Sequence, residues 1–97
     1  MATYITLANF TDQGIKSIKD TTKRAAAVQE VAKRFGASMP QIYWTMGAYD
    51  LIAMVEAPDD LSASAFSLAI GMAGNIRGQT LRAFNKDEMN AILTQLG

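Results

Sequence analysis

The side chains best suited to recognise a ligand are grouped in residues 41–56. Trp44, Tyr49 and Asp50 bring an indole, a phenol and a carboxylate to the two sides of one short turn. Such groups could bind a small amphipathic molecule by stacking and hydrogen bonding. The simpler alternative is structural: Asp50 would accept hydrogen bonds from backbone N–H groups of the turn or a neighbouring loop, or pair with an arginine, while the two aromatic rings pack against the sheet.

Two arginines are further candidates for ligand contacts. Arg24 is expected in the first turn of a helix, where it would contact an anion or a partner, or form a surface ion pair of little energetic value. Arg82 is expected in the last strand, where Asp50 or Glu56 could pair with it. The predicted ligand-binding set therefore includes both arginines, together with the residues of the turn.

The composition excludes several kinds of chemistry. The chain has no cysteine and no histidine, so it lacks thiolate ligands and the commonest general base near neutral pH. It also lacks a P-loop, a dinucleotide-binding glycine motif and a nucleophile elbow. We expect no metal site and no cofactor, and the sequence leaves open whether any reaction is catalysed.

Length and charge indicate the class of protein. The 97 residues are expected to form one domain, 1–97. Net charge is zero and the pI is about 6.1, which is unlike a nucleic-acid-binding protein. No signal peptide is visible, and no apolar run approaches the ~20 residues of a spanning helix. We therefore expect a cytoplasmic protein that does not act on membranes.

Residues 41–56 are predicted to form a β-hairpin that turns at Gly47 and Ala48. A two-residue turn with glycine first suits type II′, and it would pair Trp44 with Leu51. Strand alternation then defines two faces. The expected core face is Ile42, Trp44, Met46, Tyr49, Leu51, Ala53 and Val55, and the other face is Gln41, Tyr43, Thr45, Asp50, Ile52, Met54 and Glu56.

The rest of the chain alternates between strand and helix patterns. A strand is predicted over 3–9, a helix over 23–35 after a break at Asp20, a helix over 60–73, a strand over 76–84 and a final helix over 86–96. Thr11 and Asp59 are predicted N-caps. The final helix is expected to turn Met89, Ile92, Leu93 and Leu96 inward.

This order, βαββαβ with an added helix, predicts a ferredoxin-like α+β fold. Right-handed crossovers place the first and third strands in the centre of the sheet, with helices on one face only. The second face is expected to carry Tyr4, Thr6, Ala8, Thr80, Arg82 and Phe84 with the polar side of the hairpin. A second copy, laid face to face, would cover it.

The chain resembles the GYD family. The resemblance covers residues 4–11, 44–50, 56–59, 74–77 and 81–84, with Gly14 and Arg24 between them. It implies the fold of dimeric α/β-barrel proteins and a homo-oligomer, more than it implies an activity. The Gly-x-Tyr-Asp turn is also similar to that of the ligand-binding domain of Lrp/AsnC regulators, which bind amino acids near subunit interfaces.

The resemblance to dimeric α/β-barrel proteins also suggests a reaction. Cofactor-free monooxygenases of similar fold use an asparagine with a tryptophan, and Asn9 and Trp44 are expected on one face of this sheet. Haem-degrading relatives need a histidine ligand, which this chain lacks. The alternative structural role for Asn9 is to cap the loop that follows its strand.

Our interpretation of the sequence is a homo-oligomeric α/β-barrel protein that binds a small apolar or amphipathic molecule. The pocket would lie between the sheet and the first two helices, or at the seam between subunits. Two alternatives remain open. One is a cofactor-independent oxygenase or isomerase that uses Asn9, Trp44 and Tyr49, and the other is a structural assembly unit.

Overall fold

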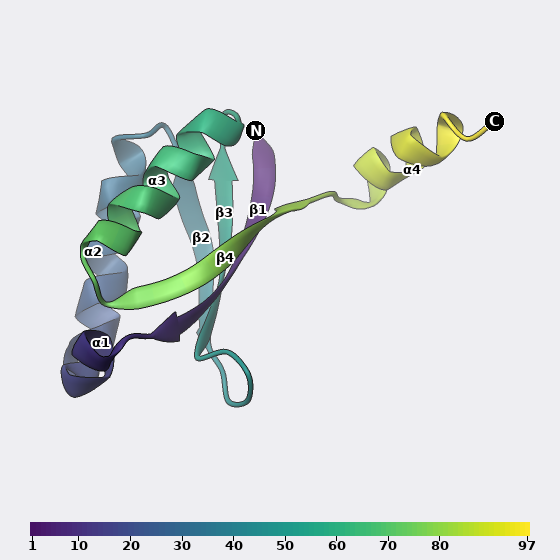
Figure 1. Cartoon of the computed structure of the whole chain (residues 1–97). Helices are drawn as coiled ribbons and strands as arrows, with labels where there is room; N and C mark the ends of the chain where they lie inside the picture. Colours follow the sequence, from purple (N-terminus) through teal and green to yellow (C-terminus); the bar gives the residue numbers. More distant parts are fainter.

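The computed structural model describes residues 1–97 and shows a four-stranded sheet with helices packed on one face (Figure 1). The strands are β1 (Ala2–Phe10), β2 (Ser38–Trp44), β3 (Leu51–Ala57) and β4 (Ile76–Ala83). The helices are α1 (Asp12–Lys16), the short 3-10 helix η1 (Ile18–Asp20), α2 (Thr21–Lys33), α3 (Asp60–Met72) and α4 (Lys86–Thr94). The predicted order of elements is confirmed, and the chain has an α+β, ferredoxin-like fold.

The sheet has the strand order β2-β3-β1-β4, with antiparallel neighbours throughout. The first and third strands are central, as the sequence predicted. Each right-handed βαβ crossover joins two parallel strands that have one other strand between them. The crossover from β1 to β2 therefore encloses β3, and the crossover from β3 to β4 encloses β1.

Side-chain caps define where the helices begin. The hydroxyl of Thr11 accepts a hydrogen bond from the backbone N–H of Gly14, and the carboxylate of Asp59 accepts one from Ser62, as predicted. α2 begins at Thr21, two residues before the predicted start. Asp20 precedes it but makes no side-chain cap bond, and the short η1 occupies the predicted break.

The core lies between the sheet and the two long helices, α2 and α3. Phe66 of α3 is fully buried and packs against Phe35, with ring centroids 6.0 Å apart. Leu51, Ala53 and Val55 of β3 are buried beneath the helices, as predicted for the apolar side of the hairpin. Burial of alternate residues along β3 fits a strand with one face on a core.

The predicted faces of β1 are wrong. Tyr4 pairs with Val55 and Ala8 with Leu51, so Tyr4, Thr6 and Ala8 lie on the helix-covered face with the core residues of β3. The same register places Thr80 and Arg82 on that face, opposite Thr6 and Tyr4. The apolar side chains of β1 occur on both sides of the strand, so alternation alone did not show which side is inward.

The other face of the sheet, which we call the open face, carries no helix (Figure 1). Strand alternation and the register assign to it the complementary residues of each strand. Its apolar members are Ile5, Leu7, Tyr43, Ile52, Met54 and Leu81. This surface is more apolar than the one the sequence predicted, because Ile5 and Leu7 replace Tyr4, Thr6 and Ala8.

The helix α4 does not pack inward as predicted. It projects from the end of β4, away from the body of the domain (Figure 1), and none of its residues is buried. Met89, Ile92, Leu93 and Leu96 are 37–78% exposed. None of the helices is both long enough and apolar enough to cross a lipid bilayer.

Candidate functional site

The hairpin ends in a six-residue loop rather than a two-residue turn. The pairing of Trp44 with Leu51 is confirmed, but β2 ends at Trp44 and β3 begins at Leu51. Gly47 adopts φ +113, a value that side-chain-bearing residues rarely adopt. Met46 is 99% exposed at the tip and is not a core residue, because the strand pattern stops before it.

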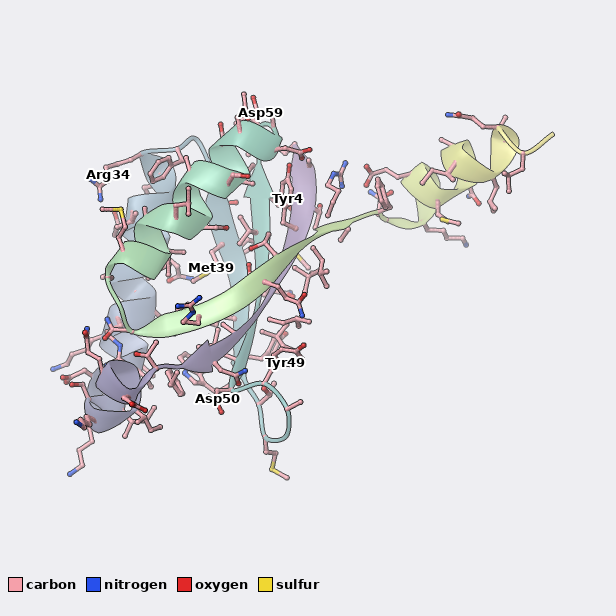
Figure 2. The ribbon with its side chains drawn as sticks, viewed as in Figure 1. Tyr4, Arg34, Met39, Tyr49, Asp50 and Asp59 are labelled. Carbon is pink, nitrogen blue, oxygen red and sulfur yellow. The ribbon has the colours of Figure 1, made fainter.

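Asp50 ties this loop to the end of β1 (Figure 2). Its Oδ2 accepts a hydrogen bond of 2.9 Å from the backbone N–H of Phe10. Its own N–H donates to the carbonyl of Ala8 at 2.9 Å and to Oδ1 of Asn9 at 3.1 Å. The predicted bonding of Asp50 to backbone N–H groups is confirmed, and the predicted pairing of Asp50 with Arg82 does not occur.

Thr45 and Tyr49 complete the base of the loop. Thr45 donates from its N–H to the carbonyl of Asp50 at 2.8 Å and from its hydroxyl to the carbonyl of Tyr49 at 2.5 Å. The phenol oxygen of Tyr49 accepts a 2.9 Å hydrogen bond from Gln79 of β4. Gln79 pairs with Leu7, so Tyr49 reaches toward the open face and does not lie in the core as predicted.

Asn9 and Trp44 lie on opposite faces of the sheet, contrary to the sequence prediction. Trp44 pairs with Leu51 on the helix side, and its indole N–H donates to the hydroxyl of Thr21 at 3.0 Å. Asn9 follows the inward-facing Ala8 and therefore lies on the open side. The structure therefore does not place Asn9 and Trp44 in one site, as the resemblance to the cofactor-free oxygenases would require.

Arg24 forms no surface ion pair, and its guanidinium is hydrogen-bonded to backbone carbonyls. Its guanidinium donates to the carbonyl of Ser17 at 2.6 Å and to that of Gly14 at 3.1 Å. These carbonyls belong to the end and interior of the short α1–η1 segment. Arg24 therefore holds that segment against α2, and both of its terminal guanidinium nitrogens are engaged in these hydrogen bonds.

Arg82 pairs with Glu88 of α4, not with Asp50 or Glu56. Its Nη2 lies 3.1 Å from Oε2 of Glu88, and Nη1 donates to the carbonyls of Thr3 and Ala83. The guanidinium also lies 4.6 Å from the ring centroid of Phe84. The sequence could not predict this pairing, because it depends on the direction in which α4 leaves the sheet.

A second polar contact missed by sequence reasoning lies at the same end of the sheet. The Tyr4 hydroxyl donates to Oδ1 of Asp60 at 2.5 Å. This hydrogen bond, with a smaller contribution from burial, raises the pKa of the Tyr4 phenol. The contact joins β1 to the first turn of α3 and helps to explain why Tyr4 faces inward (Figure 2).

A cavity of about 250 Å³ lies between the sheet and the helices α2 and α3. Of the predicted ligand-binding residues, it brings together only Arg24 and Trp44; Asn9, Tyr49, Asp50 and Arg82 are not part of its wall. The wall is mostly apolar and includes Val28, Val31, Met39, Ile42, Leu51 and Ile70. Its polar groups are few, which suits a small apolar molecule.

The fold and the cavity define a class of protein. It is an α+β domain of ferredoxin-like topology, with one covered sheet face, one open face and a small apolar cavity under its helices. The sequence profile of the GYD domain matches residues 4–93, and the chain belongs to the GYD family.

Two comparisons with proteins of Thermus thermophilus show a likeness to the chain. It is 31% identical over 84 residues to a glutamine synthetase and cystathionine beta-lyase binding protein, and the match covers 86% of this chain and 88% of the relative. The crystal structure of TTHA0845 superposes with a TM-score of 0.55 at 23% identity, over 88% of this chain and 95% of that one. The second likeness supports the fold alone.

Proposed function

We propose that this chain is a binding protein that assembles with itself through its open face and, once assembled, binds another protein. The apolar open face is the observation that carries the first part. Ile5, Leu7, Ile52 and Met54 lie side by side on two central strands, with no helix above them. Monomeric proteins rarely leave contiguous apolar patches of this kind in water.

A second copy is the natural cover for this face. Two identical sheets that stack about a two-fold axis bury the same residues on each side. Sheets pack about 10 Å apart, so the apolar side chains of both copies would interdigitate. We expect the seam to bury an area in the range of stable interfaces, on the order of 1,200–2,000 Å² in total.

Native mass spectrometry and light scattering test the self-assembly. We expect the natural chain to be at least a dimer, and Ile52→Asp to dissociate it, because a carboxylate would be buried in the seam without a partner. Lys19→Glu is the matched control, since Lys19 is exposed in η1 and is not part of the sheet. A natural chain that stays monomeric at all concentrations would refute the proposal.

The relative's name supports a protein partner. That protein is named for binding glutamine synthetase and cystathionine beta-lyase, so we propose that this chain also binds a metabolic enzyme. The hairpin loop is the surface best suited to this contact. It projects beyond the sheet (Figure 2), Met46 is 99% exposed at its tip, and Asp50 anchors its base. Exposed methionine is common at adaptable binding surfaces.

Affinity measurements test the proposed binding of a metabolic enzyme. They use the purified glutamine synthetase and cystathionine beta-lyase of the organism that makes this chain. We expect saturable binding that Met46→Asp weakens by about tenfold or more, as for a central interface residue. Ile15→Asp is the control, since Ile15 is an exposed apolar residue on α1. Equal binding by both variants would place the contact elsewhere, and no binding to either enzyme would refute this partner class.

The cavity favours a second candidate function, the binding of a small apolar molecule. A volume of about 250 Å³ is a little below the usual range for ligand pockets and would accommodate a compact ring or a short chain. Trp44, which is 41% exposed at the wall, offers a ring face for stacking. This site is separate from both the open face and the hairpin loop.

Native mass spectrometry of freshly purified protein tests the cavity. We expect a retained small molecule that Ala25→Leu displaces by filling the wall of the cavity from α2. Ala26→Leu is the matched control, because Ala26 is the neighbouring alanine but is exposed and not part of the wall. A ligand retained equally by both variants, or retained by neither the variants nor the natural chain, would count against this candidate.

A further inference from the structure

We propose that α4 of each protomer packs against the outer side of α3 in a second copy, so that two copies exchange their final helices. This inference rests on the proposed self-assembly but concerns a different surface from the open face. It gives a role to two apolar surfaces that the fold of one chain leaves in water, one on α4 and one on α3.

The helix α4 is well formed but has nothing to pack on within its own chain. Its N-terminus has a complete capping box: Asn85 accepts from the N–H of Glu88 at 2.8 Å, and Glu88 accepts from the N–H of Asn85 at 3.1 Å. Its apolar residues Met89, Ile92 and Leu93 remain exposed on one side. A helix of nine residues is marginal in water, so we infer that a tertiary contact completes it.

The contacts of Arg82 hold α4 in an outward direction. The guanidinium joins Thr3 of β1 to Glu88 in the first turn of α4 and covers the ring of Phe84 between them. Figure 1 shows α4 beyond the end of β4, apart from α2 and α3 of its own chain. From this position α4 points away from its own α3 and can reach α3 of another copy.

The outer side of α3 matches α4 in chemistry and length. Leu61, Leu68 and Met72 are 69–87% exposed and recur at positions i, i+7 and i+11, which places them in one stripe. The stripe spans roughly 16 Å, and α4 is roughly 14 Å long. Beside the stripe, a groove of about 660 Å³ runs between α3 and β4, with Gly71 and Gly78 in its wall. Small residues there would allow a helix to approach closely.

A second copy fits these two surfaces better than an unrelated partner. Both halves of the contact are present on every chain, so a two-fold pair would form it twice. The helix α4 extends beyond its own domain, so another copy can receive it without a change in the fold of either chain. Exchange of an identical end segment is a low-cost route to a dimer.

Disulfide trapping tests the exchange, because the natural chain has no cysteine. We would mix Leu93→Cys protein with Leu68→Cys protein and oxidise the mixture. A disulfide requires Cα atoms within about 7 Å, so we expect a covalent heterodimer of the two variants. A mixture of Leu93→Cys with Lys19→Cys protein is the control, since Lys19 is exposed on η1, and it should give far less product.

Three outcomes would overturn the inference. One is a mixture that is dimeric by native mass spectrometry but gives no more product than the control; the proposed self-assembly would then survive alone. The second is a Leu68→Cys/Leu93→Cys double variant that closes a disulfide within one chain, since α4 would then fold back on its own α3. The third is a monomeric natural chain, which would refute both proposals.

As an independent measure, Leu93→Asp should raise the dissociation constant of the assembly by about tenfold or more.

Discussion

At the scale of single residues, Asp50 has a structural role that two substitutions can measure. Its carboxylate accepts from the N–H of Phe10, and loss of a half-buried acceptor leaves that N–H unpaired. We expect Asp50→Ala to lower the free energy of unfolding by ~1–3 kcal/mol, and Asp50→Asn by less, because an amide oxygen can still accept. Denaturant unfolding of both variants measures this difference.

The matched control for Asp50 is Asp20→Ala. Asp20 is exposed and its side chain makes no cap bond, so we expect its removal to change stability by no more than about 0.5 kcal/mol. If Asp50→Ala behaves like Asp20→Ala but abolishes binding of a partner enzyme, the turn acts in recognition and the stabilising role is wrong.

Gly14 shows how closely the loops pack at one end of the sheet. A Cβ placed on Gly14 would lie 2.0 Å from the carbonyl oxygen of Asn75, which also accepts from the N–H of Thr11 at 3.1 Å. Gly14→Ala must therefore displace backbone, and we expect a loss of ~1–3 kcal/mol. Ser64→Ala is the control: Ser64 is exposed in α3 and makes no side-chain hydrogen bond, so the change should alter stability by no more than about 0.5 kcal/mol. Thermal unfolding that ranks the two variants in the opposite order would contradict this packing.

At the scale of elements, the first turn of α4 should respond to pH. The N–H of Asn85, and then the guanidinium of Arg82, lower the pKa of Glu88 below its ordinary value of 4.5. A depressed pKa in the folded state means that ionised Glu88 stabilises α4 above the ordinary value, and that this contribution is lost as pH falls through the lower, folded value. The protection factors of the α4 amides, which correct for the slower intrinsic exchange in acid, should therefore decrease as the pH is lowered below 4.5.

Glu88→Gln isolates this effect. The amide can still accept from Asn85, but it carries no charge for Arg82 and does not titrate in this range. We expect the pH response of α4 to disappear in this variant and to persist in Asp87→Asn, since Asp87 is exposed and makes no side-chain hydrogen bond. A response that survives in Glu88→Gln would show that another group controls the helix.

The elements also show what the sequence could and could not predict. The hairpin register and the caps at Thr11 and Asp59 follow from local patterns, and the strand order follows from the order of elements and the handedness of crossovers. The faces of β1 did not, because Tyr4 and Ile5 are equally plausible core residues by type. The side is decided by contacts distant in sequence, such as the hydrogen bond from Tyr4 to Asp60. For the same reason the sequence placed Asn9 and Trp44 on one face, whereas they lie on opposite faces in the structure.

At the scale of the whole molecule, amphipathic patterns predicted which surfaces are apolar but not which chain covers them. The sequence of α3 carries two apolar stripes, one with Leu61, Leu68 and Met72 and one with Phe66 and Ile70, and only the stripe with Phe66 is buried within the chain. The sequence likewise predicted the apolar side of α4 correctly, but the expected packing of that side against the core of the same chain was wrong. A helix pattern reports a need for burial, and a separate copy can meet that need as well as the same chain can.

The apolar open face leads to a last prediction, that stability depends on protein concentration. When folded chains associate and unfolded chains do not, mass action raises the midpoint of thermal unfolding as concentration rises. We expect this rise for the natural chain and for Lys19→Glu. Ile52→Asp should abolish it, because Ile52 lies on the open face opposite Leu7. Calorimetry over a wide range of concentration measures all three proteins. A midpoint for the natural chain that does not move with concentration would mean that one chain is stable with Ile5, Leu7, Ile52 and Met54 in water, and that the open face has another role.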